Sequence, residues 1–180
     1  CAAAQPLLLQ WAPDPTSSSM GMHATRIEPL GSIHLIVGVM DKPRNTRQIL
    51  ADLNHHHGAP LNDADGDAVR EAIREFGAAA DRGAHALRTG DANSLGGAMN
   101  AVQHLYETNL ESRFPSMRAP RLRALSKELQ RKGALGSKFS GAGGDGSIVA
   151  LFPDENTARS TTIWFETQGL KSWYVPIQSA

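Results

Sequence analysis

Hydrophobic residues along the chain follow two spacings, and each predicts a different kind of secondary structure. Residues 32–40 form a mostly apolar, β-branched run, which is typical of a buried strand. Shorter apolar runs at 134–139, 148–152 and 173–177 predict three more strands. Between the first run and the others, apolar residues recur at steps of three and four, as they do on one face of a helix.

Four helices are therefore predicted in the middle of the chain, and a fifth after Asp154. The apolar positions of the four are Ile49, Leu50 and Leu53; Val69, Ile73, Phe76, Ala80, Ala84 and Leu87; Leu95, Met99, Val102, Tyr106 and Leu110; and Leu122, Leu125 and Leu129. Gly90 is suited to end the second helix, and Asp91 to cap the third. Strands and helices mix without regular alternation, which predicts an α+β fold.

Residues 1–31 have a different character. They contain four prolines and a run of serines, which favour short extended pieces and turns. We interpret 1–31 as the remnant of a preceding domain or a connector, and 32–180 as one domain. The chain begins at Cys1 rather than at Met, which indicates that it was cut from a longer protein.

Charge and composition exclude some classes of partner. The chain has 18 basic and 18 acidic residues, so nothing favours attraction to nucleic acid or to an anionic membrane surface. Its apolar runs are too short to span a bilayer. Cys1 is the single cysteine, which excludes an internal disulfide and fits a cytoplasmic protein. The acidic stretch 63–67 lacks the downstream glutamate of a calcium loop, so no metal site is predicted.

The segment 133–147 is the strongest candidate for chemistry, because it contains six glycines, four of them between the strands predicted at 134–139 and 148–152. Glycine lets the backbone approach a ligand closely, and successive N–H groups can then form a concavity for an anion such as phosphate. Ser140 and Ser147 could add hydroxyl donors, and Lys138 a positive charge. The alternative is a plain glycine-rich turn between two strands.

The segment Lys-Phe-Ser-Gly-Ala-Gly-Gly-Asp-Gly at 138–146 resembles the third conserved motif of the GHMP kinases, which phosphorylate small molecules with ATP. A second segment, Lys-Pro-Arg-Asn-Thr-Arg at 42–47, is similar to one that begins a helix on the substrate side of mevalonate kinases. The segment 118–122 resembles one branch of bacterial sugar kinases. Two motifs in the family's order are more specific than either one alone.

The resemblance implies a ferredoxin-like C-terminal domain, with an antiparallel sheet covered by helices. It places a loop near the phosphates of ATP, made of Lys138, Ser140, Gly141, Ala142, Gly143, Gly144 and Gly146. It places Lys42, Arg44 and Thr46 on the substrate side. Asp145 stands where the family usually has glycine, and a carboxylate would repel triphosphate, so we expect it not to contact phosphate directly.

The family's N-terminal ATP-binding loop does not occur in this sequence, and the family's acidic catalytic residue is expected upstream of Cys1. No catalytic residue is therefore assigned. The hypothesis is a part of a kinase that uses ATP and Mg²⁺ on a sugar or a mevalonate-like molecule, with a sugar slightly favoured, and that is inactive alone. The alternative is a non-catalytic relative that senses a metabolite or mediates interactions. The expected partner is the protein's own N-terminal domain, with a homodimer as a further hypothesis.

Overall fold

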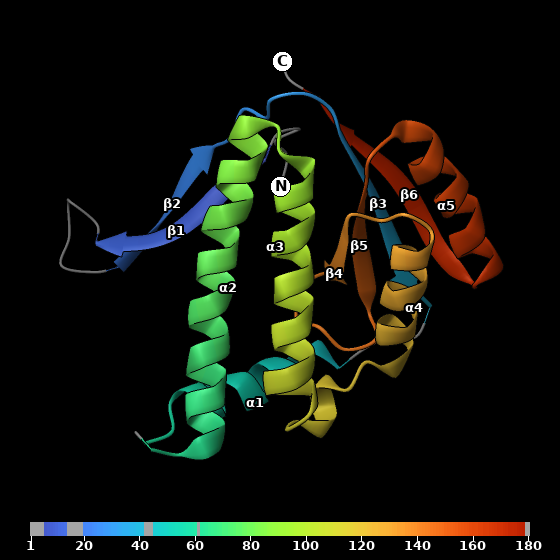
Figure 1. Cartoon of the computed structure of the whole chain (residues 1–180). Helices are drawn as coiled ribbons and strands as arrows, with labels where there is room; N and C mark the ends of the chain where they lie inside the picture. The colour runs from blue at the N-terminus through green and yellow to red at the C-terminus, as the bar shows by residue number, and fades with distance from the viewer. Residues whose placement is uncertain (1–5, 14–19, 42–44, 61, 179–180) are drawn as a thin grey trace.

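The computed structural model describes residues 6–13, 20–41, 45–60 and 62–178. Four strands form an antiparallel sheet in the order β4-β5-β3-β6. They are β3 (Ile33–Met40), β4 (Gly136–Phe139), β5 (Ser147–Phe152) and β6 (Leu170–Ile177). Helices separate β3 from β4, and one helix separates β5 from β6, so the chain order is that of a ferredoxin-like fold. The α+β class and the antiparallel sheet are confirmed (Figure 1).

The helices α4 (Pro120–Arg131) and α5 (Glu155–Thr167) lie over one face of this sheet (Figure 1). The leucines predicted to face inward on α4, at 122, 125 and 129, are buried. On α5 the buried ring of Phe165 packs on Gly38 of β3. A Cβ atom at position 38 would lie 2.8 Å from that ring, which explains a glycine inside a buried strand.

The remaining helices are α1 (Thr46–His57), α2 (Ala64–Thr89) and α3 (Ala92–Leu105). Gly90 ends α2 in the left-handed conformation, with φ of 70°, and Asp91 caps α3, both as predicted. The third helix was predicted to continue to Leu110. Instead it changes at Tyr106 into a π-helical turn, η1 (Tyr106–Glu111), which is followed by a short 3₁₀ turn, η2 (Pro115–Met117).

Helix α3 closes the β4 edge of the sheet. The Asn100 side chain donates to the carbonyl oxygen of Leu135 at 3.1 Å and accepts from the Ser137 N–H at 3.0 Å. The Gln103 side-chain oxygen accepts from the Phe139 N–H at 2.9 Å. Two amide side chains thus satisfy backbone groups that an additional strand would otherwise bond.

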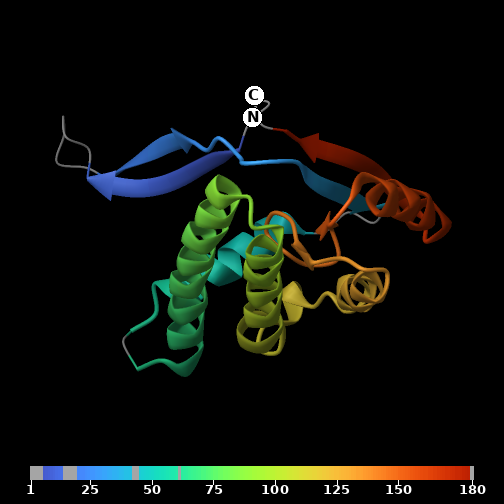
Figure 2. The ribbon, with the colours of Figure 1, turned by 45° about the horizontal axis from the view of Figure 1, so that its top comes forward.

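Residues 1–31 were predicted to be extended pieces and turns, and within them two strands pair as a second antiparallel sheet. They are β1 (Leu7–Pro13) and β2 (Met20–Arg26), and Figure 2 shows them beyond the upper end of α2. The register puts Leu9 opposite Ala24 and Trp11 opposite Met22, so apolar side chains share one exposed face. Among all described residues, no helix is long and apolar enough to cross a membrane.

Candidate functional site

The glycine-rich loop joins β4 to β5 as a tight turn. Gly141, Gly143 and Gly144 have φ of 75°, 85° and 68°, a conformation that side chains rarely adopt. At the base of the loop, the Ser140 N–H donates to the carbonyl of Ser147 at 2.9 Å. The Gly146 N–H donates to the Gly144 carbonyl, also at 2.9 Å. Hydrogen bonds within its own backbone therefore contribute to the conformation of the loop.

Tyr106, the first residue of η1, supports the loop from below. Its side chain is 1% exposed. The hydroxyl accepts from the Gly144 N–H at 2.7 Å and donates to the Met117 carbonyl at 2.5 Å. A Cβ atom at position 143 would lie 2.4 Å from the tyrosine ring, so the ring fits only beneath a glycine. Sequence reasoning treated Tyr106 as an ordinary apolar helix position and missed this role.

Asp145 lies in the loop but interacts with a neighbouring helix. Its carboxylate accepts from the Leu122 N–H at 2.9 Å and from the Arg121 N–H at 3.4 Å. These N–H groups belong to the first turn of α4, where no helical carbonyl is available and where the helix dipole favours a negative charge. Asp145 thus caps α4, which gives a structural reason for a carboxylate where the family usually has glycine.

The loop and the start of α1 line one cavity of about 500 Å³. Thr46 contributes from α1, and Gly141 and Ala142 contribute from the loop, so residues about 95 positions apart in the sequence meet there. The N–H groups of Gly141 and Ala142 make no hydrogen bond within the part of the chain that the structure describes. They remain available to an anionic oxygen.

The remaining walls of this cavity are apolar and come from α1, α2, η1 and β4. They are Leu50, Leu53, Ile73, Phe76, Tyr106, Leu110 and Phe139. Leu50 and Ile73 were predicted on the buried faces of their helices, yet they are 48% and 46% exposed. The apolar stripes extend beyond the core because they also form the cavity wall. Apolar ligand surface would be buried against them.

Lys138 was grouped with the loop, but it faces a different cavity. It lines a hollow of about 350 Å³ between α2 and α3, with apolar neighbours that include Ala80, Leu95 and Met99. Its ammonium group donates to the Phe139 carbonyl at 2.6 Å. Burial lowers the pKa of this ammonium group below its usual value, because desolvation penalises the charged form. The structure therefore separates Lys138 from Gly141 and Ala142.

The two other residues predicted on the substrate side, Lys42 and Arg44, lie outside the described residues. Only Thr46 of that group can be placed. The two free loop amides fit a phosphate oxygen of ATP. The described residues contain no cluster of three His, Cys, Asp or Glu side chains that could hold a metal ion by themselves.

Residues 84–161 match the family described as GHMP kinases C terminal. The resemblance to the GHMP kinases that was predicted from the motifs is therefore confirmed for this part of the chain. Over 140 residues the chain is 30% identical to mevalonate kinase of Aeropyrum pernix, covering 77% of this chain and 40% of that protein.

Solved structures show the same fold. The structure of L. major mevalonate kinase in complex with R-mevalonate has a TM-score of 0.71 at 18% identity, covering 96% of this chain and 49% of that chain. Streptococcus pneumoniae phosphomevalonate kinase, in complex with phosphomevalonate and AMPPNP, has a TM-score of 0.62 at 17% identity. That match covers 87% of this chain and 44% of that chain. The chain thus spans less than half the length of these relatives.

Proposed function

We propose that this chain forms the acceptor-side part of an ATP-dependent kinase that phosphorylates a hydroxyl group of mevalonate or a close analogue. The observation that carries the proposal is the cavity shared by Thr46, Gly141 and Ala142. It combines a hydroxyl and two unbonded backbone N–H groups with apolar walls. Phosphoryl transfer depends mainly on positioning and on stabilisation of charge, which groups of this kind can supply.

The cavity walls favour mevalonate over a sugar. A sugar carries hydroxyl groups on nearly every carbon, and each would lose water against Leu50, Ile73 or Leu110 without gaining a hydrogen bond. Mevalonate carries a methyl group and methylene groups beside its carboxylate and hydroxyls. The relatives named above include mevalonate kinases, which also supports this acceptor. The earlier slight preference for a sugar is therefore replaced in this proposal.

Asp145 in the glycine-rich loop, together with the missing N-terminal half, motivated the hypothesis of a non-catalytic relative. Its carboxylate is bonded to the first turn of α4, and it is absent from the lining of the cavity with Gly141 and Ala142. Its charge is therefore partly compensated by N–H donors and the helix dipole. This geometry removes the argument that position 145 prevents phosphate from binding, and it supports the catalytic alternative.

The proposal is tested with the full-length protein that carries this domain, and with the 180-residue chain alone as a comparison. We expect ATP-dependent phosphorylation of R-mevalonate by the full-length protein, and no turnover by the chain alone. Galactose and phosphomevalonate serve as competing acceptors. If the full-length protein binds R-mevalonate and ATP but forms no phosphorylated product, the non-catalytic alternative is correct.

A pair of threonine variants tests the role of the cavity. Thr46→Val keeps the shape of the side chain but removes the hydroxyl, so it should raise KM for R-mevalonate by about tenfold, the effect of one lost hydrogen bond. Thr167→Val, at the end of α5, removes a hydroxyl that donates to the Trp164 carbonyl at 2.7 Å and does not line the cavity. It should leave KM unchanged.

A further inference from the structure

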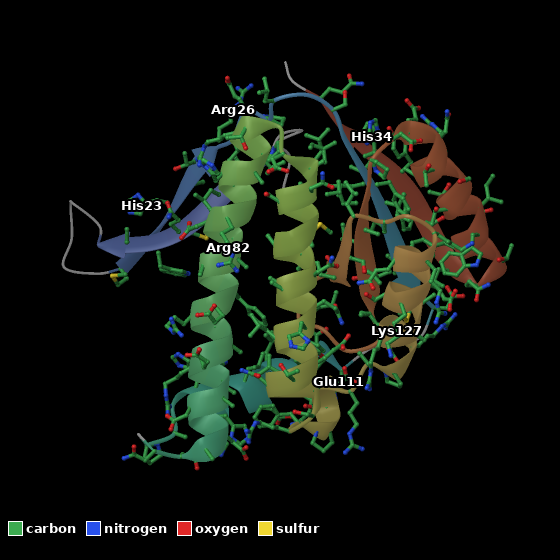
Figure 3. All side chains as sticks on the ribbon, viewed as in Figure 1. His23, Arg26, His34, Arg82, Glu111 and Lys127 are labelled. Atoms are coloured by element: carbon green, nitrogen blue, oxygen red, sulfur yellow. The ribbon has the colours of Figure 1, made fainter. Side chains whose placement is uncertain are left out.

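A second, polar cavity lies on the other side of η1. It has a volume of about 330 Å³ and lies where η1, the connection after it and α4 meet. Its lining residues are Glu107, Glu111, Ser112, Arg118, Pro120 and Arg123. Figure 3 shows Glu111 at the end of the α3 helix, where the chain turns toward α4. The proposed kinase function makes no use of these side chains.

Glu111 has an unmet hydrogen-bonding requirement. Its side chain is 4% exposed. One carboxylate oxygen, Oε1, accepts from the Arg123 guanidinium at 2.6 Å and from the Ala119 N–H at 3.1 Å. The other oxygen, Oε2, is buried and has no hydrogen-bond partner among the described residues. A buried carboxylate oxygen without a donor is costly, so the site favours a donor from outside the chain.

Arg118 provides a positive charge that has no ionic partner among the described residues, just as Glu111 has an oxygen without a donor. It is exposed, and its guanidinium forms no salt bridge within the described part of the chain, whereas Arg123 is paired with Glu111. Glu107 is partly engaged, because it accepts from the Gln103 side chain at 2.9 Å. The cavity therefore offers one guanidinium that can bind an anion and one buried carboxylate oxygen that can accept a hydrogen bond.

We propose that this second cavity binds a small organic acid that also carries a hydroxyl or ammonium group. The acid group would pair with Arg118, and the hydroxyl or ammonium would donate to Oε2 of Glu111. The volume equals that of about ten water molecules, which suits an acid of three or four carbons. A bare metal cation is disfavoured by the two arginines, and a bare anion would leave Glu111 unsatisfied.

The position of the site relates it to the glycine-rich loop. The π turn η1 directs Tyr106 and Leu110 toward the first cavity, and Glu107 and Glu111 toward the second. Turns of this kind are rare and are often found at functional sites. Since Tyr106 also bonds the loop, a ligand on Glu111 contacts the same turn that holds the loop in place. The two cavities therefore share one structural element, η1.

Binding to the 180-residue chain can be measured by calorimetry with four probes. L-serine and D-glycerate each carry an acid group and a donor; acetate carries only the acid, and glycerol only donors. We expect L-serine and D-glycerate to bind. Acetate and glycerol should bind at least about tenfold more weakly, because acetate can pair only with Arg118 and glycerol can donate only to Glu111. Thr46→Val, in the first cavity, should not change L-serine binding.

Variants at exposed arginines keep this test independent of folding. Arg118→Gln should weaken L-serine binding by about tenfold or more, since it removes a charge-assisted hydrogen bond. Arg131→Gln, at the far end of α4, is the matched control and should have no effect; Arg131 pairs with Glu128 on the surface. Circular dichroism checks that both variants fold.

Three results would overturn the proposal. One is that a folded chain binds none of the four probes, which would mean that Glu111 is satisfied by water alone. Another is that acetate binds as tightly as L-serine, which would reduce the site to a surface arginine. The third is that Arg118→Gln binds L-serine like the unmodified chain.

Discussion

Replacing Tyr106 with phenylalanine is the most direct test of how the glycine-rich loop is held. The substitution removes one oxygen atom and keeps the ring, so the core is not emptied. Two buried backbone groups then lose their partner: the Gly144 N–H, bonded at 2.7 Å, and the Met117 carbonyl, bonded at 2.5 Å. The variant therefore isolates hydrogen bonding from packing.

The expected cost follows from these two groups. A buried donor or acceptor left without a partner costs about 1–3 kcal/mol, so the two groups together should make Tyr106→Phe less stable by about 2–6 kcal/mol. That is a large part of the stability of a typical domain, which is about 5–15 kcal/mol. With a urea m-value of about 2 kcal/mol/M, the unfolding midpoint should fall by about 1–3 M.

Tyr174→Phe provides the matched control, because it removes the same atom at a half-buried surface position. The Tyr174 hydroxyl lies 2.8 Å from Nδ1 of His34, where water can replace it, so the cost should be about 0.5 kcal/mol. Urea unfolding followed by circular dichroism measures both variants. A Tyr106→Phe variant as stable as Tyr174→Phe would refute the role given to Tyr106.

Three further predictions concern stability and use urea unfolding. Gly143→Ala should lower the free energy of unfolding by about 2–5 kcal/mol, because the new Cβ clashes with Tyr106 in addition to the strain of positive φ. Gly133→Ala is the control: its φ is 91° but the space around it is open, so it should cost about 1–2 kcal/mol. Equal costs for the two variants would contradict the clash. Gly96→Ala should destabilise the chain by about 1–3 kcal/mol, since the new Cβ would lie 2.5 Å from the Leu135 carbonyl oxygen. Gly97→Ala, where a Cβ would meet open space, should stabilise the chain by about 0.5–1 kcal/mol because alanine favours the helix. A stabilising Gly96→Ala would show that α3 can shift. Hydrogen bonds from Ser94 lower the pKa of Asp91 below 3.8, so the stability that Asp91 contributes to the fold is complete above that pH and is lost as the pH falls through the folded-state pKa. Asp91→Ala should therefore reduce the loss of stability at acid pH, measured by urea unfolding between about pH 2 and 6. An unchanged slope would contradict the role of Asp91 as the cap of α3.

Much of the fold could be predicted from local patterns. Hydrophobic periodicity located the strand at β3 and the helices α1, α2 and α4, because burial and secondary structure impose the same spacing there. The end of α3 could not be predicted in this way. Tyr106 continues the helical spacing, and its change to a π turn depends on contacts with Gly144 and Met117, which are distant in the sequence.

The candidate site was predictable only in part. The motif pattern identified the loop and the start of α1, which the structure brings to one cavity through Thr46, Gly141 and Ala142. The motif could not show which cavity Lys138 lines, because that depends on how α2 and α3, which are distant from the motif in the sequence, pack beside β4. Leu50 and Ile73 could have indicated the cavity from the sequence, because they widen the apolar faces of α1 and α2 beyond the residues that the core buries.

The closure of the β4 edge by α3 has a consequence for motion. Asn100 and Gln103 fix the helix to the strand, and Gly96 and Gly136 bring the two backbones into contact. Sliding α3 along β4 would break these bonds together, so α3, β4 and the loop should move as one rigid body. Any opening of the cavity beside the loop must then involve its other helical walls, α1 and α2, and α1 is the shorter of these two helices.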